Sequence, residues 1–486
     1  MTVKELEPRR VFEIFDQITK VPRPSKKEEK IRKFVLDFAA AHGLEAKTDE
    51  VGNVAITKPA TPGHENAPKV ILQGHMDMVC ESNDKSFDFE NQPIPAYVDG
   101  DWVKTHGTTL GADNGIGMAA ALAIVTDPTV VHGPLEVLLT MDEETGMTGA
   151  FGIGEGMIDG DILINLDSED DAELFVGCAG GVDTQAFFTY SRSFAPKDFR
   201  YFRLDVAKGQ GGHSGGDIHL GRANANKLLA RFLFNISLKH EVQISEIDGG
   251  NLRNAIPRAA HAVFGVHGSK KEEIVAEFNK YVATIGNEYK DLEPTLELSL
   301  ESMDQPEFCI DIETSTKLIR SLYCAPHGVV SMSRDLEGLV ETSTNLASVK
   351  MAENNQIVVT TSQRSSVDSR KWDIANQVEA LFLLAGAEVK HGEGYPGWQP
   401  NMQSTILAIA RDAYKELYNV TPAVKAIHAG LECGLFLTKY PHLDMVSFGP
   451  TLRNVHSPSE MMYIPAVERF YEQIKLTLKK VADLKK

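Results

Sequence analysis

Acidic residues and a histidine follow three apolar segments of this 486-residue chain. The segment VILQG leads into His75 and Asp77, LEVLLTM is followed closely by Glu143 and Glu144, and DILINL ends in Asp167. Continuous apolar runs of this length are typical of buried strands. Because ligands of an open α/β sheet bind at the carboxyl ends of its strands, we expect these side chains to meet.

His75 and Asp77 are two residues apart, so they share one face of an extended chain. A histidine that binds a metal needs its other ring nitrogen held in place, and a carboxylate commonly does this. The alternative is a strand end whose His and Asp only cap a loop. The tripeptide alone favours that alternative, and the partners elsewhere in the chain favour a metal site.

Asp113 lies in TTLGADNGIGMAAALAIV, where a Gly-rich turn leads into a helix of small residues. The glycine spacing matches neither G-x-G-x-x-G nor a P-loop, which disfavours a nucleotide site. Small residues instead allow the helix to lie close to a sheet and the backbone to approach a ligand. An Asp in such a turn is otherwise a common turn former.

The candidates together form a set of carboxylates and imidazoles without a thiolate: His75, Asp77, Asp113, Glu143, Glu144, Asp167 and His456. These ligand types suit Zn²⁺, Mn²⁺ or Co²⁺, and several carboxylates can neutralise two divalent ions. The five cysteines are scattered and form no C-x-x-C pair, so neither a disulfide framework nor a thiolate zinc site is indicated.

The composition is that of a globular protein, with 42% hydrophobic and 24% charged residues, and the length favours two domains. A net charge of -19 argues against nucleic acid and anionic membranes as partners. The N-terminal residues lack the pattern of a signal peptide, and the longest apolar run is too short to span a bilayer. We therefore expect a cytoplasmic protein.

The order of elements predicts an α/β catalytic domain with a mixed central sheet flanked by helices. Residues 1–184 and 389–486 form this domain, and residues 185–388 form an inserted α+β lid domain. A β-α-β-β-α order occurs twice in the insertion, which suggests two ferredoxin-like halves. Near the N-terminus a helix is expected over residues 26–42, with Ser25 and Glu28 in the spacing of a capping box.

Several blocks in one order give a much more specific signal than any single motif: QGHMDMV, TTLGADNGIGMA, HGPLEVLLTMDEETGM, CAGG, GGHSGG, NAIPR, YPGWQP, HAGLECGLF and the final HSP. Over essentially its whole length the chain resembles the dinuclear zinc metallopeptidases, a family that includes aminoacylases, glutamate carboxypeptidases, tripeptidases and Xaa-His dipeptidases. The last group is the most similar.

This resemblance implies a role for each candidate. His75 and Asp167 bind one zinc ion, Glu144 and His456 bind the other, and Asp113 bridges both. Asp77 orients His75, and Glu143 is the general base. The peptide bond between Asp113 and Asn114 is expected to be cis.

The resemblance also assigns residues of the inserted domain. His213, in GGHSGG, is expected to hold the carbonyl oxygen in the transition state. Asn254, Arg364 and the backbone of Gly430 match positions that bind the substrate's C-terminal carboxylate, which suits the fork of an arginine. For Arg364 an ordinary strand-edge charge is an equal alternative. Glu432 is a candidate supporting residue.

The implied reaction is hydrolysis of dipeptides, preferentially Xaa-His and including carnosine, by a hydroxide shared by two divalent ions with Glu143 as base. Co²⁺ or Mn²⁺ are possible substitutes for zinc. A tripeptidase or an N-acyl amino acid deacylase on the same fold is the alternative, since it shares all the metal residues. A binding protein without activity is expected to lack some of them. A homodimer is implied, and whether His213 serves its own site or a partner's is open.

Overall fold

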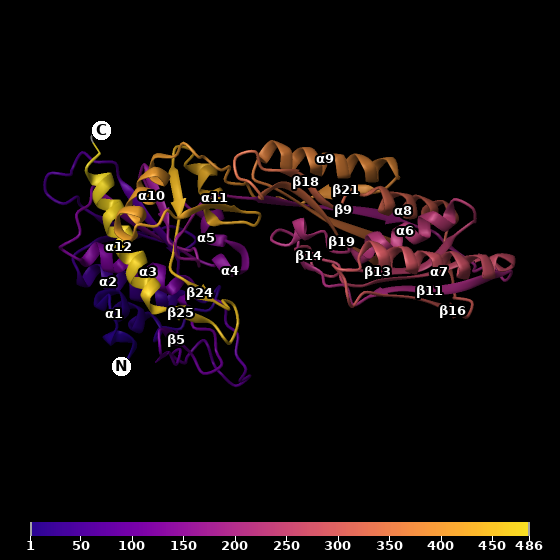
Figure 1. The fold of residues 1–486 in the computed structure, drawn as a ribbon, viewed down its shortest axis with the longest axis horizontal. Coiled ribbons are helices and arrows are strands. Elements are labelled where there is room, and N and C mark those ends of the chain that lie inside the picture. Colours follow the sequence, from indigo (N-terminus) through magenta and orange to yellow (C-terminus); the bar gives the residue numbers. More distant parts are fainter. Residues whose placement is uncertain (1, 485–486) are drawn as a thin grey trace. The chain divides into compact units, whose positions relative to one another are not determined.

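The computed structural model describes residues 2–484, and the chain divides into two compact units. The first unit comprises residues 1–177, 400–426 and 431–486, and the second comprises residues 178–399 and 427–430. The second unit is therefore inserted into the first. In Figure 1 the first unit carries both ends of the chain.

A mixed eight-stranded sheet forms the centre of the first unit, in the order β1-β2-β6-β3-β7-β23-β8-β22. Strand β3 lies parallel to both β6 and β7, so the carboxyl ends of these three strands meet at one edge. All their residues are buried, as the apolar runs predicted. The strands are β1 (Glu45–Thr48), β2 (Val54–Lys58), β3 (Val70–His75), β6 (Leu135–Thr140), β7 (Ile162–Asn165), β8 (Glu173–Cys178), β22 (Ala423–Ile427) and β23 (Asp444–Ser447).

Helices surround this sheet, and α3 is the most deeply buried of them, because all but its last residue are buried. A Cβ atom at Gly117 would lie 2.5 Å from the carbonyl oxygen of Leu166, so the small residues allow the close approach that the sequence predicted. The helices are α1 (Arg9–Ile18), α2 (Glu29–Ala41), α3 (Ala112–Thr126), α4 (Glu143–Gly146), α5 (Thr148–Gly152), α10 (Thr405–Tyr418), α11 (Glu432–Lys439) and α12 (Ile464–Ala482), with a 3₁₀ turn at Val3–Glu5.

A second, four-stranded sheet lies in the first unit, in the order β24-β25-β5-β4. These strands have two or three residues each, too few for a periodic pattern: β4 (Tyr97–Asp99), β5 (Trp102–Lys104), β24 (Leu452–Arg453) and β25 (Met461–Tyr463). The connection between β24 and β25 carries His456.

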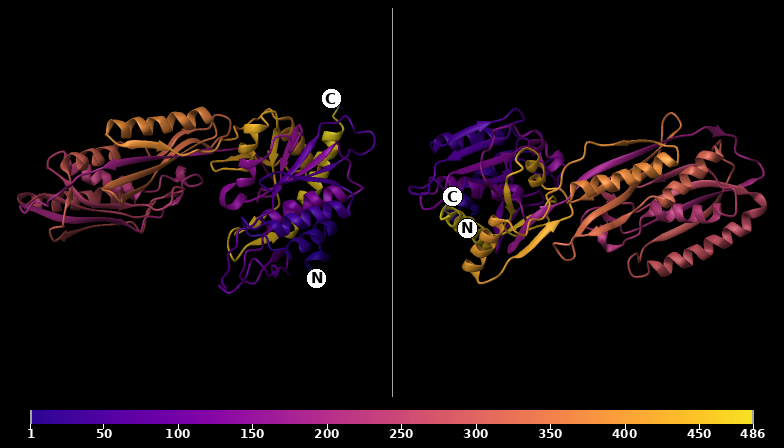
Figure 2. Two further views of the ribbon diagram at one scale, coloured as in Figure 1. Left: turned by 180° about the vertical axis from the view of Figure 1, so that it is seen from behind. Right: turned by 90° about the horizontal axis from the view of Figure 1, so that it is seen from above.

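The second unit is built on a nine-stranded sheet in the order β16-β11-β15-β13-β19-β20-β9-β21, with β18 paired to β19. Its helices pack against these strands over an aliphatic and aromatic core, and Figure 2 shows them running along the sheet. The helices are α6 (Ala225–Ser237), α7 (Lys271–Glu288), α8 (Ile312–Cys324) and α9 (Asp368–Leu384), with 3₁₀ turns at Ile218–Leu220 and Gly268–Lys270. Its division into two ferredoxin-like halves stays a prediction.

The strands of the second unit's main sheet are β9 (Gly180–Thr189), β11 (Phe199–Ala207), β13 (Gln243–Gly249), β15 (Ala260–His267), β16 (Glu297–Met303), β18 (Gly328–Met332), β19 (Val340–Ala352), β20 (Gln356–Ser365) and β21 (Glu388–His391). Two small ladders join β10 (Arg192–Ser193) to β17 (Cys309–Ile310), and β12 (Gly212–His213) to β14 (Ala255–Ile256). Strand β9 begins before the predicted insertion of residues 185–388, and β21 ends after it. Both belong to the second unit, because β9 pairs with β20 and β21 pairs with β9.

The helix expected over residues 26–42 begins later, at Glu29, because Lys26 takes a left-handed conformation with φ of 65°. Its N-cap is Glu28, which makes no capping hydrogen bond with its side chain, so the predicted capping box is wrong. Ser25 and Glu28 instead reach residues distant in sequence, as described below. Among residues 2–484 no helix is long and apolar enough to span a membrane.

Candidate active site

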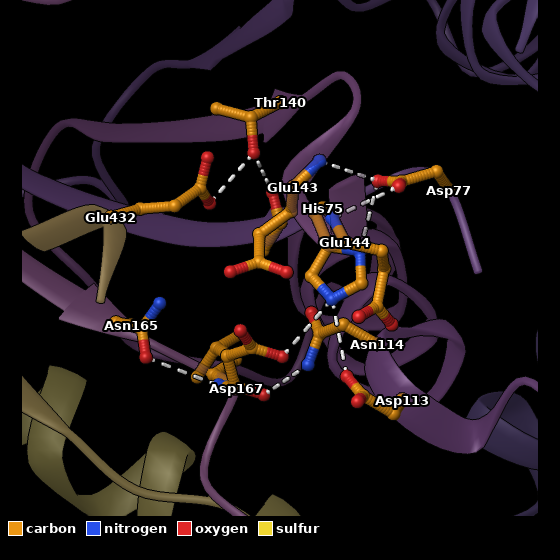
Figure 3. A network of polar contacts seen from close by, with 12 residues as sticks. His75, Asp77, Asp113, Asn114, Thr140, Glu143, Glu144, Asn165, Asp167 and Glu432 are labelled. Atoms are coloured by element: carbon orange, nitrogen blue, oxygen red, sulfur yellow. Dashed lines mark hydrogen bonds and ion pairs between the residues drawn. The ribbon is translucent and has the colours of Figure 1, made fainter. Parts of the chain in front are cut away.

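Six of the seven residues gathered from the sequence come together at the carboxyl edge of β3, β6 and β7 (Figure 3), and His456 joins them through its contacts with Asp113 and Glu144. His75 is the last residue of β3 and is completely buried. Its Nε2 atom lies 3.1 Å from Asp113 Oδ1 and 3.4 Å from Asp167 Oδ1. Its Nδ1 atom lies 3.2 Å from Asp77 Oδ1, so the imidazole is held from both sides.

Asp113 occupies the centre of the cluster. One carboxylate oxygen faces His75, and the other lies 3.0 Å from His456 Nε2. The bond between Asp113 and Asn114 is cis, as the resemblance implied. The Asn114 side chain donates to the carbonyl oxygen of Leu166 at 2.7 Å, which connects this turn to the segment that carries Asp167. Asp113 is thus the residue shared by both histidines.

Glu143 and Glu144 begin the short helix α4, directly after Asp142 turns the chain with φ of 50° beyond the end of β6. Glu144 Oε2 lies 3.0 Å from His456 Nε2, which places Glu144 in the cluster. In Figure 3 the two glutamate carboxyl groups point to different sides of the His75 ring. The two side chains therefore have separate surroundings.

Asp77 organises the site more widely than its expected contact with His75. Its two oxygens accept hydrogen bonds from the backbone N–H groups of Glu143 (3.0 Å) and Glu144 (3.2 Å). Ser25 Oγ also donates to it, at 2.7 Å. Burial alone would raise the pKa of Asp77, but the hydrogen bonds from His75 and these other donors lower it to about 2.

The electrostatics indicate a site built for cations. Burial, with Glu432 and Glu144 nearby, raises the pKa of Glu143 to about 8. Hydrogen bonds to Asp113 and Glu144 raise the pKa of His456 to about 11. The raised pKa values show that these groups tend to hold protons among the crowded carboxylates, and bound cations would displace those protons.

The donor set fits divalent metal ions. Ligand atoms of His75, Asp113 and Glu144 all lie within 4.8 Å of one another. Among residues 2–484, the buried atom Glu144 Oε1 has no hydrogen-bond partner, and Asp167 Oδ1 has only the 3.4 Å contact with His75, although buried carboxylate oxygens are normally hydrogen-bonded. Imidazole and carboxylate ligands with a shared aspartate can hold ions such as zinc, cobalt or manganese.

Two supporting residues that the sequence analysis missed bind the turn before Asp113. The buried carboxylate of Glu460 accepts from the N–H groups of Leu110 (2.7 Å), Gly111 (3.0 Å) and Ala112 (2.8 Å). Arg23 donates to the carbonyl oxygen of Gly111, and also to those of Met76 (3.0 Å) and Asp77 (2.6 Å). The one sequence feature that could have indicated Glu460 is its position four residues after the candidate ligand His456.

Glu28 and Glu432 support the edge of β6. Glu28, which is fully buried, accepts from the N–H of Asp142 at 2.9 Å. It therefore holds the turn that leads into Glu143 and Glu144. Glu432 accepts from Gln73 Nε2 at 2.6 Å and from Thr140 Oγ1 at 2.8 Å. Its position agrees with the supporting role expected from sequence.

The remaining candidates lie together in the second unit. His213 is in β12, which pairs with β14, and β14 begins directly after Asn254. The N–H of Ser214 donates to the carbonyl oxygen of Asn254 at 2.8 Å. Burial and the charge of Arg364 lower the pKa of His213, which indicates that the two are close. Arg364 is 8% exposed on β20, between β19 and β9, so the alternative of a strand-edge charge is wrong. Gly430 faces Tyr395, the tyrosine that contacts Arg364.

Comparison with known proteins identifies the family. Residues 71–480 match Peptidase family M20/M25/M40. The chain belongs to this family. It is 43% identical to the cytosol non-specific dipeptidase of Escherichia coli over 480 residues, which cover 99% of each chain. The aminoacylhistidine dipeptidase of Vibrio alginolyticus has a similar crystal structure, with a TM-score of 0.93, 42% identity and 98% of each chain covered.

Membership makes this chain a peptide hydrolase of a metal-dependent family, and the cluster around Asp113 is its candidate metal site. The prediction of the family and of its mixed α/β fold is confirmed. An aminopeptidase PepT from Bacillus cereus shares the fold alone, with a TM-score of 0.61 and 15% identity.

Proposed function

We propose that this protein is a metallo-dipeptidase that hydrolyses dipeptides, preferentially those with a C-terminal histidine and including carnosine. The observation that carries the proposal is the convergence of two histidines on Asp113, next to the separately held Glu143. The names of the two similar proteins, a non-specific dipeptidase and an aminoacylhistidine dipeptidase, support a dipeptide substrate.

The proposed cofactor is a pair of Zn²⁺ ions, with Co²⁺ or Mn²⁺ as substitutes. His75 and Asp167 would hold one ion, Glu144 and His456 the other, and Asp113 both. The opposed contacts of the two Asp113 oxygens, one toward each histidine, support this division. When bound, such a pair polarises the scissile carbonyl and lowers the pKa of the attacking water.

Glu143 is proposed as the general base. Its carboxyl accepts the proton of the attacking water and passes it to the nitrogen of the leaving amine. Asp77 fixes the backbone of Glu143 and also orients His75, so one buried carboxylate positions both groups. Because the pKa of Asp77 is about 2, its carboxylate is ionised at neutral pH and can hold Glu143 and His75 there.

Recognition of the substrate is assigned to the second unit. We propose that His213 stabilises the carbonyl oxygen in the transition state. Asn254, Arg364 and the backbone of Gly430 bind the terminal carboxylate. A dipeptide carries this carboxylate one residue beyond the scissile bond, and the fork of an arginine can bind a carboxylate through two hydrogen bonds.

Further parts of the proposal are a cytoplasmic location and a homodimer. A tripeptidase or an N-acyl amino acid deacylase on the same fold is the competing function, because it would use the same metal residues. The substrate alone separates these activities.

The test is a substrate panel with metal-depleted protein reloaded with zinc, cobalt or manganese. We expect activity only after reloading, and faster hydrolysis of Xaa-His dipeptides than of tripeptides or N-acyl amino acids. Faster hydrolysis of either competing class would replace the dipeptidase assignment. Full activity in excess chelator would contradict the metal mechanism itself.

A further inference from the structure

Three sequence motifs meet at the ring of Tyr395 in the second unit: CAGG and YPGWQP, which have no assigned role, and HAGLECGLF, which carries Gly430. The backbone of Tyr395 pairs with Gly181 of the CAGG motif, with N–H to oxygen distances of 2.8 and 3.0 Å. A Cβ atom at Gly181 would lie 2.8 Å from the ring, and one at Gly430 would lie 3.0 Å from it. Two glycines on different segments therefore form a slot that fits the aromatic ring.

The backbone of Tyr395 is held as firmly as its ring. Lys371, which is only 2% exposed, donates from Nζ to the carbonyl oxygen of Tyr395 at 2.7 Å. Gly180 lies so close to the segment after Tyr395 that a Cβ atom there would be 2.5 Å from the carbonyl carbon of Pro396. The tyrosine is thus fixed in direction before any ligand binds.

The phenol oxygen of Tyr395 lies 2.9 Å from Nη1 of Arg364, which donates to it. A phenol has one donor in addition to its acceptor lone pairs. Among residues 2–484, Arg364 is the one residue that forms a hydrogen bond with the Tyr395 hydroxyl oxygen. Within the same residues, the buried Nε atom of Arg364 has no hydrogen-bond partner. The pair therefore offers a neutral donor beside a charged one, next to Gly430.

Building on the proposed function, we propose that Tyr395 is a specificity residue that donates its hydroxyl hydrogen to the C-terminal carboxylate of the substrate, alongside Arg364. The phenol also fixes one arm of the guanidinium, so that the remaining arginine donors face the same ligand. A carboxylate has enough lone pairs to accept from both residues. An amide at that position offers one oxygen and presents two N–H donors to the donors of the site.

The hydroxyl must keep its proton in order to donate it. Burial raises the pKa of Tyr395 above its usual value, although the nearby charge of Arg364 lowers it. The phenol is therefore protonated at neutral pH. The donor is available under the conditions in which a dipeptidase works.

The test compares Ala-His with its C-terminal amide, using zinc-loaded wild type and the Tyr395→Phe variant. Wild type should prefer the free acid. The variant should lose about 10- to 100-fold of that preference, because it lacks a hydrogen bond to a charged group. The loss should be a rise in KM for the acid, with hydrolysis of the amide and the metal content unchanged.

Tyr201→Phe is the matched control, because it removes a buried hydroxyl that donates to Pro196 within the same unit. A second variant, Gly181→Ala, keeps the hydroxyl but pushes the ring from its slot, and it should lower the preference for the acid in the same direction. If Tyr395→Phe keeps the wild-type preference, or slows both substrates equally, the inference is wrong. If wild type itself does not distinguish acid from amide, the proposed carboxylate recognition fails, and this inference fails with it.

Discussion

Removal of the Glu460 carboxylate should disturb both the stability of the protein and its affinity for metal. This carboxylate is 3% exposed and accepts four backbone hydrogen bonds of 2.7 to 3.4 Å from the turn that leads into Asp113, the longest of them from the N–H of Asp113 itself. Arg23, which is 2% exposed and donates to the carbonyl oxygen of Gly111 in the same turn, is attracted by the charge of Glu460. The Glu460→Ala substitution would leave four N–H groups without their acceptor and would remove the negative charge that attracts Arg23.

The magnitude follows from these contacts. A hydrogen bond to a charged group contributes about 1.5–3 kcal/mol, but the cost of burying the carboxylate offsets part of the total. Breaking a buried ionic network typically costs about 3–5 kcal/mol, and we expect that loss in the free energy of unfolding. The released turn should also displace Asp113, so the metal affinity should fall at least about tenfold.

Chemical denaturation of the metal-free variant measures the first effect, and titration with zinc followed by calorimetry measures the second. Glu468→Ala on the exposed face of α12 is the control and should match wild type in both. A Glu460→Ala protein with wild-type stability and wild-type zinc affinity would refute the view that Glu460 positions the bridging aspartate.

Three further predictions concern the site. The Glu144→Gln variant should bind one ion more weakly, as elemental analysis measures, and its activity should recover partly in excess metal. Unchanged metal affinity would show that Glu144 is not a ligand. Zinc affinity should rise with pH between about 6 and 8, because the metal-free site holds protons on His456, with a pKa of about 11, and on Glu143, with a pKa of about 8. Calorimetry in buffers of different ionisation enthalpy should detect proton release, and binding without it would contradict the sign. His213→Ala should lower turnover about 10²-fold or more with metal content intact; normal turnover would make His213 only a loop residue.

The edge of the central sheet could be predicted because its signal is local. Continuous apolar runs identified β3, β6 and β7, and the polar residues that follow each run identified most of the cluster. Parallel pairing then brings the strand ends together without further information. His456 gave no such signal, since it follows a two-residue strand in a polar loop, and only the resemblance to a family indicated its role.

Supporting contacts were harder to predict because they join residues distant in sequence. Ser25 and Glu28 have the spacing of a local capping box, yet they bind Asp77 and the backbone of Asp142. The three-residue spacing of Ser25 and Glu28 is the same whether they form a local capping box or bind distant segments, so the sequence cannot distinguish the two arrangements. The packing of Tyr395 against Gly181 is likewise visible only once distant segments are placed together.

The most direct test of the proposed mechanism is the turnover of a dipeptide by the Glu143→Gln variant, measured together with its metal content. This substitution keeps the size of the side chain but removes its basic oxygen. Loss of a general base lowers turnover by about 10²–10⁴-fold. We predict a loss of this size in a variant that holds about two ions per chain, the number that we also expect for wild type. Wild-type turnover in the fully metal-loaded variant would contradict the role of Glu143, and loss of an ion would show that it is a ligand instead.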